Sequence, residues 1–90
     1  MKASEIIKSE GLVLLRERNK VSPDKGQPWE YDVKEAFTGK KTGWIYLDAF
    51  TKSAMLTVYN ALPPDRQKIY DTIPFMRLVD FTWKVVKASK

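Results

Sequence analysis

Apolar residues recur at helical spacing in the second half of the chain and predict three helices there. The first begins near Thr51, a good N-cap, although Asp48 could also serve this helix end. It ends at Pro63-Pro64, because the residue before a proline leaves the α region. Pro64 suits the first turn of a second, short helix that runs to about Asp71. A third helix is expected over residues 74–88, with one wide apolar stripe.

The first half of the chain carries strand patterns behind a short predicted helix at residues 2–10, for which Ser4 is a candidate N-cap. Three segments are predicted as strands: Leu12–Glu17, Trp29–Val33 and Trp44–Leu47. The first is apolar on both faces, as in a central strand, and the second alternates with period two. The third places Trp44 and Tyr46 on one face. We therefore expect a three-stranded antiparallel sheet.

These elements predict a single α+β domain over residues 1–90: a short N-terminal helix, a small three-stranded antiparallel sheet, and three C-terminal helices packed on one face. The predicted core comprises Leu14, Tyr31, Ile45, Leu47, Val58, Leu62, Leu78, Val79 and Val86. The short second helix should add Ile69, with Tyr70 as a second candidate. A chain of this size buries only about 60–65% of its unfolded surface, so the core is thin. A homodimer that shares apolar surface is compatible with such a core.

The composition removes most catalytic and metal-binding chemistry. The chain has no cysteine, which excludes disulfides and thiol catalysis, and no histidine, the commonest general base and metal ligand. We therefore expect no enzymatic activity, no cofactor and no metal site. The longest uninterrupted apolar run, residues 12–15, is too short for a secretion signal or a transmembrane span. We expect a cytoplasmic protein with no membrane partner.

Positive charge collects in the helical half of the chain. The net charge is +5, and residues 51–90 hold seven basic and three acidic groups. On the third helix, Arg77, Lys84 and Lys87 lie largely outside the apolar stripe. They could contact phosphates or bases if this were the recognition helix of a helix-turn-helix variant. Against this, the preceding turn lacks the usual glycine and Asp80 would face the DNA. A solvated basic surface is the alternative interpretation.

The turn at residues 38–43 superficially resembles a phosphate loop, but the motif fails. Position 34 is lysine where the motif needs glycine, and Lys40 is followed by Lys41 where it needs a hydroxyl residue. The two lysines predict a basic turn tip. The Ser22–Pro28 segment is a long, turn-rich loop and a second candidate contact surface. Glu30 and Asp32 would share a strand face, which is typical of a solvated edge strand more than of a cation site.

Four aromatic residues of the predicted sheet allow two interpretations: Trp29, Tyr31, Trp44 and Tyr46. With basic neighbours they could form an aromatic face on which unpaired bases stack. They could instead pack the sheet against the helices. The first interpretation makes Trp29 and Trp44 candidate interaction residues.

The run from residue 43 to residue 54, followed by Val58–Leu62 and Leu78–Phe81, resembles small uncharacterised accessory proteins of tailed phages and prophages. The resemblance covers residues 43–86 and carries over no functional residue. It implies an accessory protein that acts in the bacterial cytoplasm, where proteins of that kind often bind and inhibit host factors.

Two hypotheses for the function follow. The first is a small non-catalytic binding protein, encoded by a phage or prophage, whose partner is a host or phage protein. The alternative is a nucleic-acid-binding protein that uses the basic C-terminal helices or an aromatic sheet face. The candidate interaction residues are Lys40, Lys41, Arg77, Lys84, Lys87, Trp29 and Trp44. Salt distinguishes the two, since nucleic-acid binding weakens steeply as salt rises.

Overall fold

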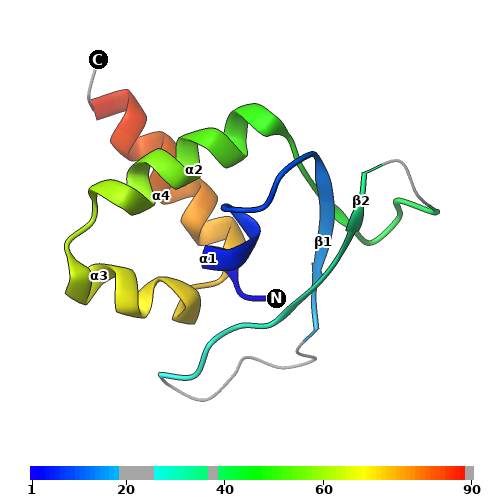
Figure 1. Cartoon of the computed structure of the whole chain (residues 1–90), viewed down its shortest axis with the longest axis horizontal. Coiled ribbons are helices and arrows are strands. Elements are labelled where there is room, and N and C mark those ends of the chain that lie inside the picture. Colours follow the sequence, from blue (N-terminus) through cyan, green and yellow to red (C-terminus); the bar gives the residue numbers. More distant parts are fainter. Residues whose placement is uncertain (19–25, 37–38, 89–90) are drawn as a thin grey trace.

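The chain folds as predicted into an α+β structure, seen in a computed structural model that describes residues 1–18, 26–36 and 39–88 (Figure 1). The elements in chain order are α1 (Ala3–Ile6), β1 (Val13–Glu17), β2 (Tyr31–Glu35), β3 (Ile45–Leu47), α2 (Ala49–Ala61), α3 (Pro64–Ile69), the 3-10 turn η1 (Tyr70–Thr72) and α4 (Phe75–Ala88). The helices gather on one side of the sheet (Figure 1). None of the helices in the described ranges is long and apolar enough to cross a bilayer.

The sheet is antiparallel throughout, in the order β2-β1-β3, so the apolar first strand is central as its sequence predicts. Leu15 pairs with Val33 on one side and with Ile45 on the other. Side chains alternate between faces along a strand, so these three residues share the inner face, which packs on the helices. Tyr31 and Leu47 are fully buried on the same face.

The other face, called the outer face below, holds the strand residues Leu14, Arg16, Asp32, Lys34 and Tyr46. Tyr31 and Tyr46 therefore lie on opposite faces, and the prediction of one shared aromatic face is wrong. The reason is register: Leu14, not Leu15, pairs with Tyr46. A single aromatic face would have required the pairing of β3 to slip by one residue.

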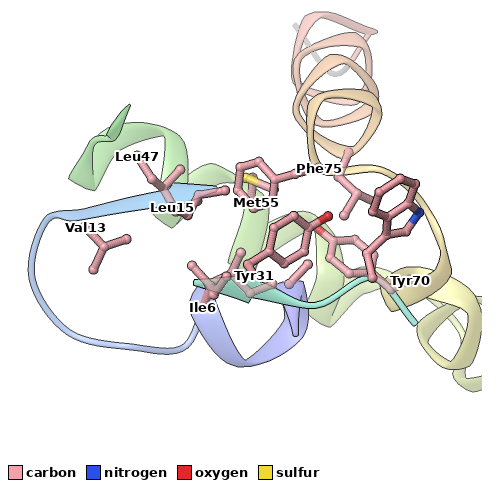
Figure 2. Packing of buried hydrophobic residues seen from close by; sticks show 12 residues of the cluster. Ile6, Val13, Leu15, Tyr31, Leu47, Met55, Tyr70 and Phe75 are labelled. Atoms are coloured by element: carbon pink, nitrogen blue, oxygen red, sulfur yellow. The ribbon is translucent and has the colours of Figure 1, made fainter. Parts of the chain in front are cut away.

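The core joins the inner sheet face to three helices (Figure 2). Tyr31 meets Phe75 edge to face at 5.7 Å between ring centroids, and Met55 from α2 lies in the same cluster. Of the predicted core, five residues are buried: Leu14, Tyr31, Leu47, Val58 and Leu78. The other four are half-buried: Ile45, Leu62, Val79 and Val86. Buried residues outside that list include Ile6, Trp29, Met55, Tyr70 and Phe75, and for Trp29 this agrees with the interpretation that packs the aromatics against the helices.

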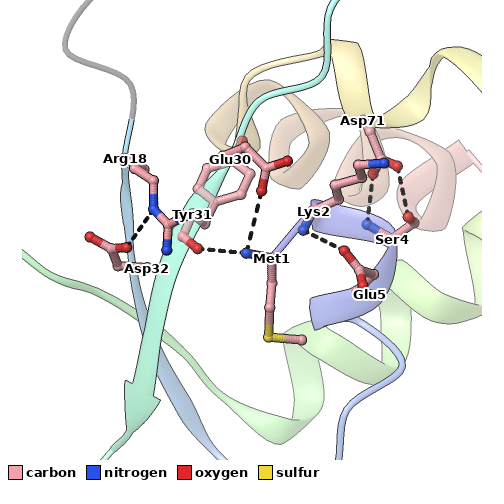
Figure 3. Close-up of polar contacts among 9 residues, drawn as sticks. All are labelled: Met1, Lys2, Ser4, Glu5, Arg18, Glu30, Tyr31, Asp32 and Asp71. Atoms are coloured by element: carbon pink, nitrogen blue, oxygen red, sulfur yellow. Dashed lines mark hydrogen bonds and ion pairs between the residues drawn. The ribbon is translucent and has the colours of Figure 1, made fainter.

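Helix α1 is shorter than predicted and is held by a distant carboxylate (Figure 3). Ser4 is not its N-cap, because Lys2 occupies that position. Instead the Ser4 amide and hydroxyl each donate to an oxygen of Asp71, both at 2.8 Å. The Trp29 amide donates to the Asp71 carbonyl, which draws the start of β2 to the same point. Asp71 thus joins three segments that lie far apart in the sequence.

Helix α2 starts earlier than predicted and is fastened near its N-terminal end. Its N-cap is Asp48, the second of the two candidates, whose carboxylate accepts from the Thr51 amide at 2.6 Å. This bond satisfies one of the amides that have no partner within the first helical turn. One turn further on, Lys52 is buried, and its ammonium donates to the carbonyls of Ser9 and Gly11 just after α1. Lys52 therefore ties α2 to the N-terminal segment.

Candidate interaction surfaces

A groove of about 500 Å³ opens between α3 and α4. It is lined by Leu62, Pro63, Arg66, Ile69, Tyr70, Ile73, Arg77, Leu78 and Phe81. The contributing positions are 66 and 69 on α3 with 70 at the start of η1, and 77, 78 and 81 on α4. Residues three and four apart share a helix face, so one face of α3, continued by Tyr70, and one face of α4 supply the two walls. The groove is therefore built between two helices, with the end of α2 closing one side.

The junction between α2 and α3 positions the α3 wall of the groove. Leu62 precedes a proline and is extended, which ends α2, and Pro63, also before a proline and extended, leads the chain into α3. The Gln67 side chain then donates to the Tyr59 carbonyl at 2.9 Å and ties α3 to the end of α2. Below them, Tyr59 and Tyr70 meet edge to face at 4.9 Å between centroids. Burial raises the pKa of Tyr70 above its ordinary value.

Two large apolar side chains lie open at the groove. Ile69 is 47% exposed and Phe81 is 41% exposed, one on each wall. The prediction that Ile69 is buried is wrong, because Tyr70 takes the inward position of this short helix and leaves Ile69 facing the groove. Exposed apolar residues that cluster around a concavity, in contrast to scattered ones, mark interaction surfaces.

The groove is also positively charged. Arg66 belongs to the α3 wall and Arg77 to the α4 wall, so a cation stands on each side of the apolar floor. Neither forms an ion pair with any residue in the described part of the chain. A shallower depression continues along α4, lined by Arg77, Asp80, Phe81 and Lys84. The groove therefore combines an apolar centre with basic margins.

The three candidate residues on α4 do not all lie on one surface. Arg77 and Lys84 lie seven residues apart, on one face of the helix, and both line the shallow depression. Asp80 lies between them in the same depression. Its negative charge there counts against a DNA-recognition role for α4, as expected from the sequence. Lys87 is exposed in the last turn of α4 and lines neither depression.

A second cationic surface lies on the outer face of the sheet. The ring of Trp44 lies 4.5 Å from the Arg16 guanidinium carbon and 4.3 Å from the Lys34 nitrogen, measured to its centroid. The Lys34 nitrogen also donates to the Lys40 carbonyl at 2.6 Å, which places the basic turn beside this face. Tyr46 is 48% exposed and flanks Leu14 on the same face.

Asp32 binds two arginines at the far end of the outer face, of which Figure 3 shows Arg18. Its two carboxylate oxygens accept from Arg18 at 2.9 Å and from Arg16 at 3.3 Å. These bonds hold the pKa of Asp32 below its ordinary value, with Arg18 the larger cause. Each guanidinium uses only one of its five donors here, so both retain donors for a ligand.

The remaining candidate residues lie in different parts of the structure. Trp29 is 7% exposed and belongs to the core, so it cannot form part of an interaction surface, and that prediction is wrong. Trp44 is half-buried on the outer face, and Lys40 and Lys41 are exposed in the turn that precedes it. Most of the Ser22–Pro28 loop lies outside the described residues. Glu30 reaches the N-terminal amine at 3.5 Å, apart from Asp32, so these two carboxylates do not form a paired site.

Sequence reasoning missed the residues that make the groove. Arg66 and Phe81 were not singled out and Ile69 was expected in the core, although positions 66, 69 and 70 already show the helical spacing of one face. Among the described residues, no cluster of three or more acidic side chains could hold a metal ion.

Comparisons of the chain with protein-family models, with curated proteins and with solved structures found no match.

Proposed function

We propose that this chain is a small non-catalytic binding protein whose α3–α4 groove takes a helical segment of a partner protein. The observation that carries the proposal is the placing of exposed Ile69 and Phe81 between Arg66 and Arg77. An amphipathic helix lays its apolar face into such a groove and anchors at positions three or four residues apart. The absence of cysteine and histidine supports a binding role over a catalytic one.

The positive charge of the groove indicates which kind of helical segment would bind there. One arginine on each wall and Lys84 beyond them outnumber the single acid, Asp80, that lines either depression. A segment with aspartate or glutamate on both flanks of its apolar stripe would meet a cation on either side. A basic segment would meet like charge. The proposed occupant is therefore an acidic amphipathic helix.

The resemblance of residues 43–86 to accessory proteins of tailed phages and prophages supports the biological side of the proposal. In that setting the partner is a host or phage protein in the bacterial cytoplasm. The resemblance carries over no functional residue, so the choice of the groove rests on its lining alone.

Site-specific photo-crosslinking in a bacterial lysate tests the proposal. A benzophenone side chain replaces Ile69 in one variant and Thr57, exposed on α2, in the matched control. We expect adducts from position 69 that are absent from position 57 and that map to an acidic segment with helical apolar spacing. The variant Arg66→Glu/Arg77→Glu should lower their yield at least tenfold, while Arg16→Gln/Lys34→Gln should not.

Three outcomes would overturn the proposal. Equal adducts from positions 69 and 57 would show that the groove is not preferred. A captured segment rich in lysine or arginine would contradict the charge argument. An adduct between two copies of this chain, with a dimeric mass in solution, would make the groove a homodimer interface.

A further inference from the structure

The outer face of the sheet carries a concentration of positive charge that the sequence order hides. Residues 1–50 have nine basic and eight acidic groups, which is nearly neutral. Folding nevertheless gathers five of those basic residues at or beside one face: Arg16, Arg18, Lys34, Lys40 and Lys41. Asp32 is the single acid among the strand residues of that face. The face is therefore strongly basic although its half of the chain is not.

The cations on this face are held in place around an aromatic ring. Arg16 and Lys34 both lie against Trp44, and Asp32 fixes the guanidinium groups of Arg16 and Arg18. Lys34 is further held by the Lys40 carbonyl. Ordering these long side chains in the free protein lowers the entropy that binding would otherwise lose. An anionic ligand thus meets a pre-arranged row of donors that crosses from β2 over β1 to the start of β3.

The same face offers an exposed aromatic ring beside the cations. Tyr46 is 48% exposed and lies across β1 from Lys34, since both pair with Leu14. Stacking of unpaired bases on exposed aromatic residues, next to basic side chains that follow the phosphates, is the usual mode of single-strand recognition. A free phosphate ion would bind the cations but would make no use of the exposed ring. In duplex DNA the bases are stacked on one another and cannot reach the ring, so a single strand fits this face best.

We propose that the outer face binds single-stranded nucleic acid, with Arg16, Lys34 and their basic neighbours on the phosphates and Tyr46 beneath a base. The site is separate from the α3–α4 groove. It uses Trp44 as the support that positions two cations. Of the two nucleic-acid surfaces that the sequence allowed, this one uses the sheet and not the C-terminal helices.

Fluorescence anisotropy with a labelled 12-nucleotide oligothymidine tests the proposal across a salt series. With about four phosphates neutralised, the logarithm of the association constant should fall with the logarithm of salt with a slope near −3. The same measurement with a duplex of equal length should show weaker binding. No binding to the single strand at 50 mM salt, or tighter binding to the duplex, would overturn the proposal.

Matched variants locate the site. Arg16→Gln/Lys34→Gln should halve the salt slope, while Arg66→Gln/Arg77→Gln removes the same charge from the groove and should leave the slope nearly unchanged. Equal losses in the two variants would overturn the assignment to the sheet. Thermal melting of each variant confirms that it is folded, and the photo-crosslinking result for the groove does not depend on this site.

A second pair tests the stacking. Tyr46→Leu should weaken oligothymidine binding about tenfold, in line with the contribution of one stacked base, whereas Phe50→Leu, an exposed aromatic on α2, should not. An unchanged affinity in Tyr46→Leu, with inorganic polyphosphate competing as well as the oligonucleotide, would reduce the site to a general anion surface and overturn the proposal. Binding to vesicles of anionic lipid but not to the oligonucleotide would do the same.

Discussion

Replacing Lys52 with methionine should destabilise the fold more than any other removal of a single charge. The ammonium of Lys52 donates to the Ser9 carbonyl at 2.7 Å and also to the Gly11 carbonyl. Lys52 itself is only 7% exposed. Methionine keeps the length and apolar stem of the side chain and removes the donors. The change therefore isolates the polar link between α2 and the segment after α1.

The expected loss follows from two opposing effects. A hydrogen bond to a charged group contributes roughly 1.5–3 kcal/mol, and Lys52 makes two. Removing the ammonium also removes the cost of burying it, which offsets part of the loss. Gly11 is exposed, so water can satisfy its carbonyl in the variant, whereas the Ser9 carbonyl is less accessible. We expect a net loss of about 2 kcal/mol of unfolding free energy.

Urea unfolding followed by tryptophan fluorescence measures this loss. With a slope of about 1 kcal/mol per molar for a small domain, the midpoint should fall by about 2 M while the slope stays the same. The control is Lys68→Met on α3, where the side chain is exposed and the change should cost less than about 0.5 kcal/mol. Equal midpoints for Lys52→Met and the wild type would show that the two bonds only balance the cost of burying the charge.

Three further predictions concern the core, the link to α1 and acid stability. Leu78→Ala should cost about 2–5 kcal/mol by opening a cavity in the core, against less than about 0.5 kcal/mol for exposed Lys68→Ala, measured by urea unfolding. Ser4→Ala and Asp71→Ala should be non-additive by at least about 0.5 kcal/mol in a double-mutant cycle, because Ser4→Ala removes the hydroxyl that donates to that carboxylate, while the Ser4 amide keeps its own bond to it. The Thr51 amide holds the pKa of Asp48 below its ordinary value of 3.8, so its contribution to stability is complete above that value and is lost as pH falls through the lower folded pKa. Asp48→Asn, which keeps a capping side chain, should flatten the stability curve between pH 5 and pH 2, as measured by thermal melting.

Each of these predictions has an outcome that would contradict it. Equal midpoints for Leu78→Ala and Lys68→Ala would remove Leu78 from the core. Strict additivity in the cycle would show that Ser4 and Asp71 do not depend on each other. An unchanged acid limb in Asp48→Asn would assign the acid sensitivity to other carboxylates, of which Asp32 also has a lowered pKa.

Much of the helical half could be predicted because its signals are local. Pro64 sets the start of α3 through its own ring, and the prolines at 63 and 64 end α2 by a steric clash with the preceding residue. The apolar spacing of α4 correctly predicted Leu78 as core and placed Arg77 outside the stripe. These effects involve residues within one helical turn of each other, and so they can be read from the chain order.

The start of α2 shows the limit of such local signals. Asp48 and Thr51 were both acceptable caps, and the sequence favoured Thr51. The chain leaves β3 at Leu47 with Asp48 already extended, so the carboxylate three residues before the Thr51 amide takes the bond. The choice between two adequate caps was thus decided by where the preceding strand ends.

The sequence by itself determined the α+β class, the central position of the first strand, and the exclusion of histidine and cysteine chemistry. It could not determine which residues from distant segments meet. The pairing of Leu14 with both Lys34 and Tyr46 decided that the aromatics divide between two faces and that the basic residues gather on one. The groove likewise depends on how α3 packs, because Tyr70 takes the inward position and leaves Ile69 exposed where the helical pattern alone predicted burial. Strand register and helix packing depend on the free energy of the whole core, and no local stretch of sequence encodes that sum.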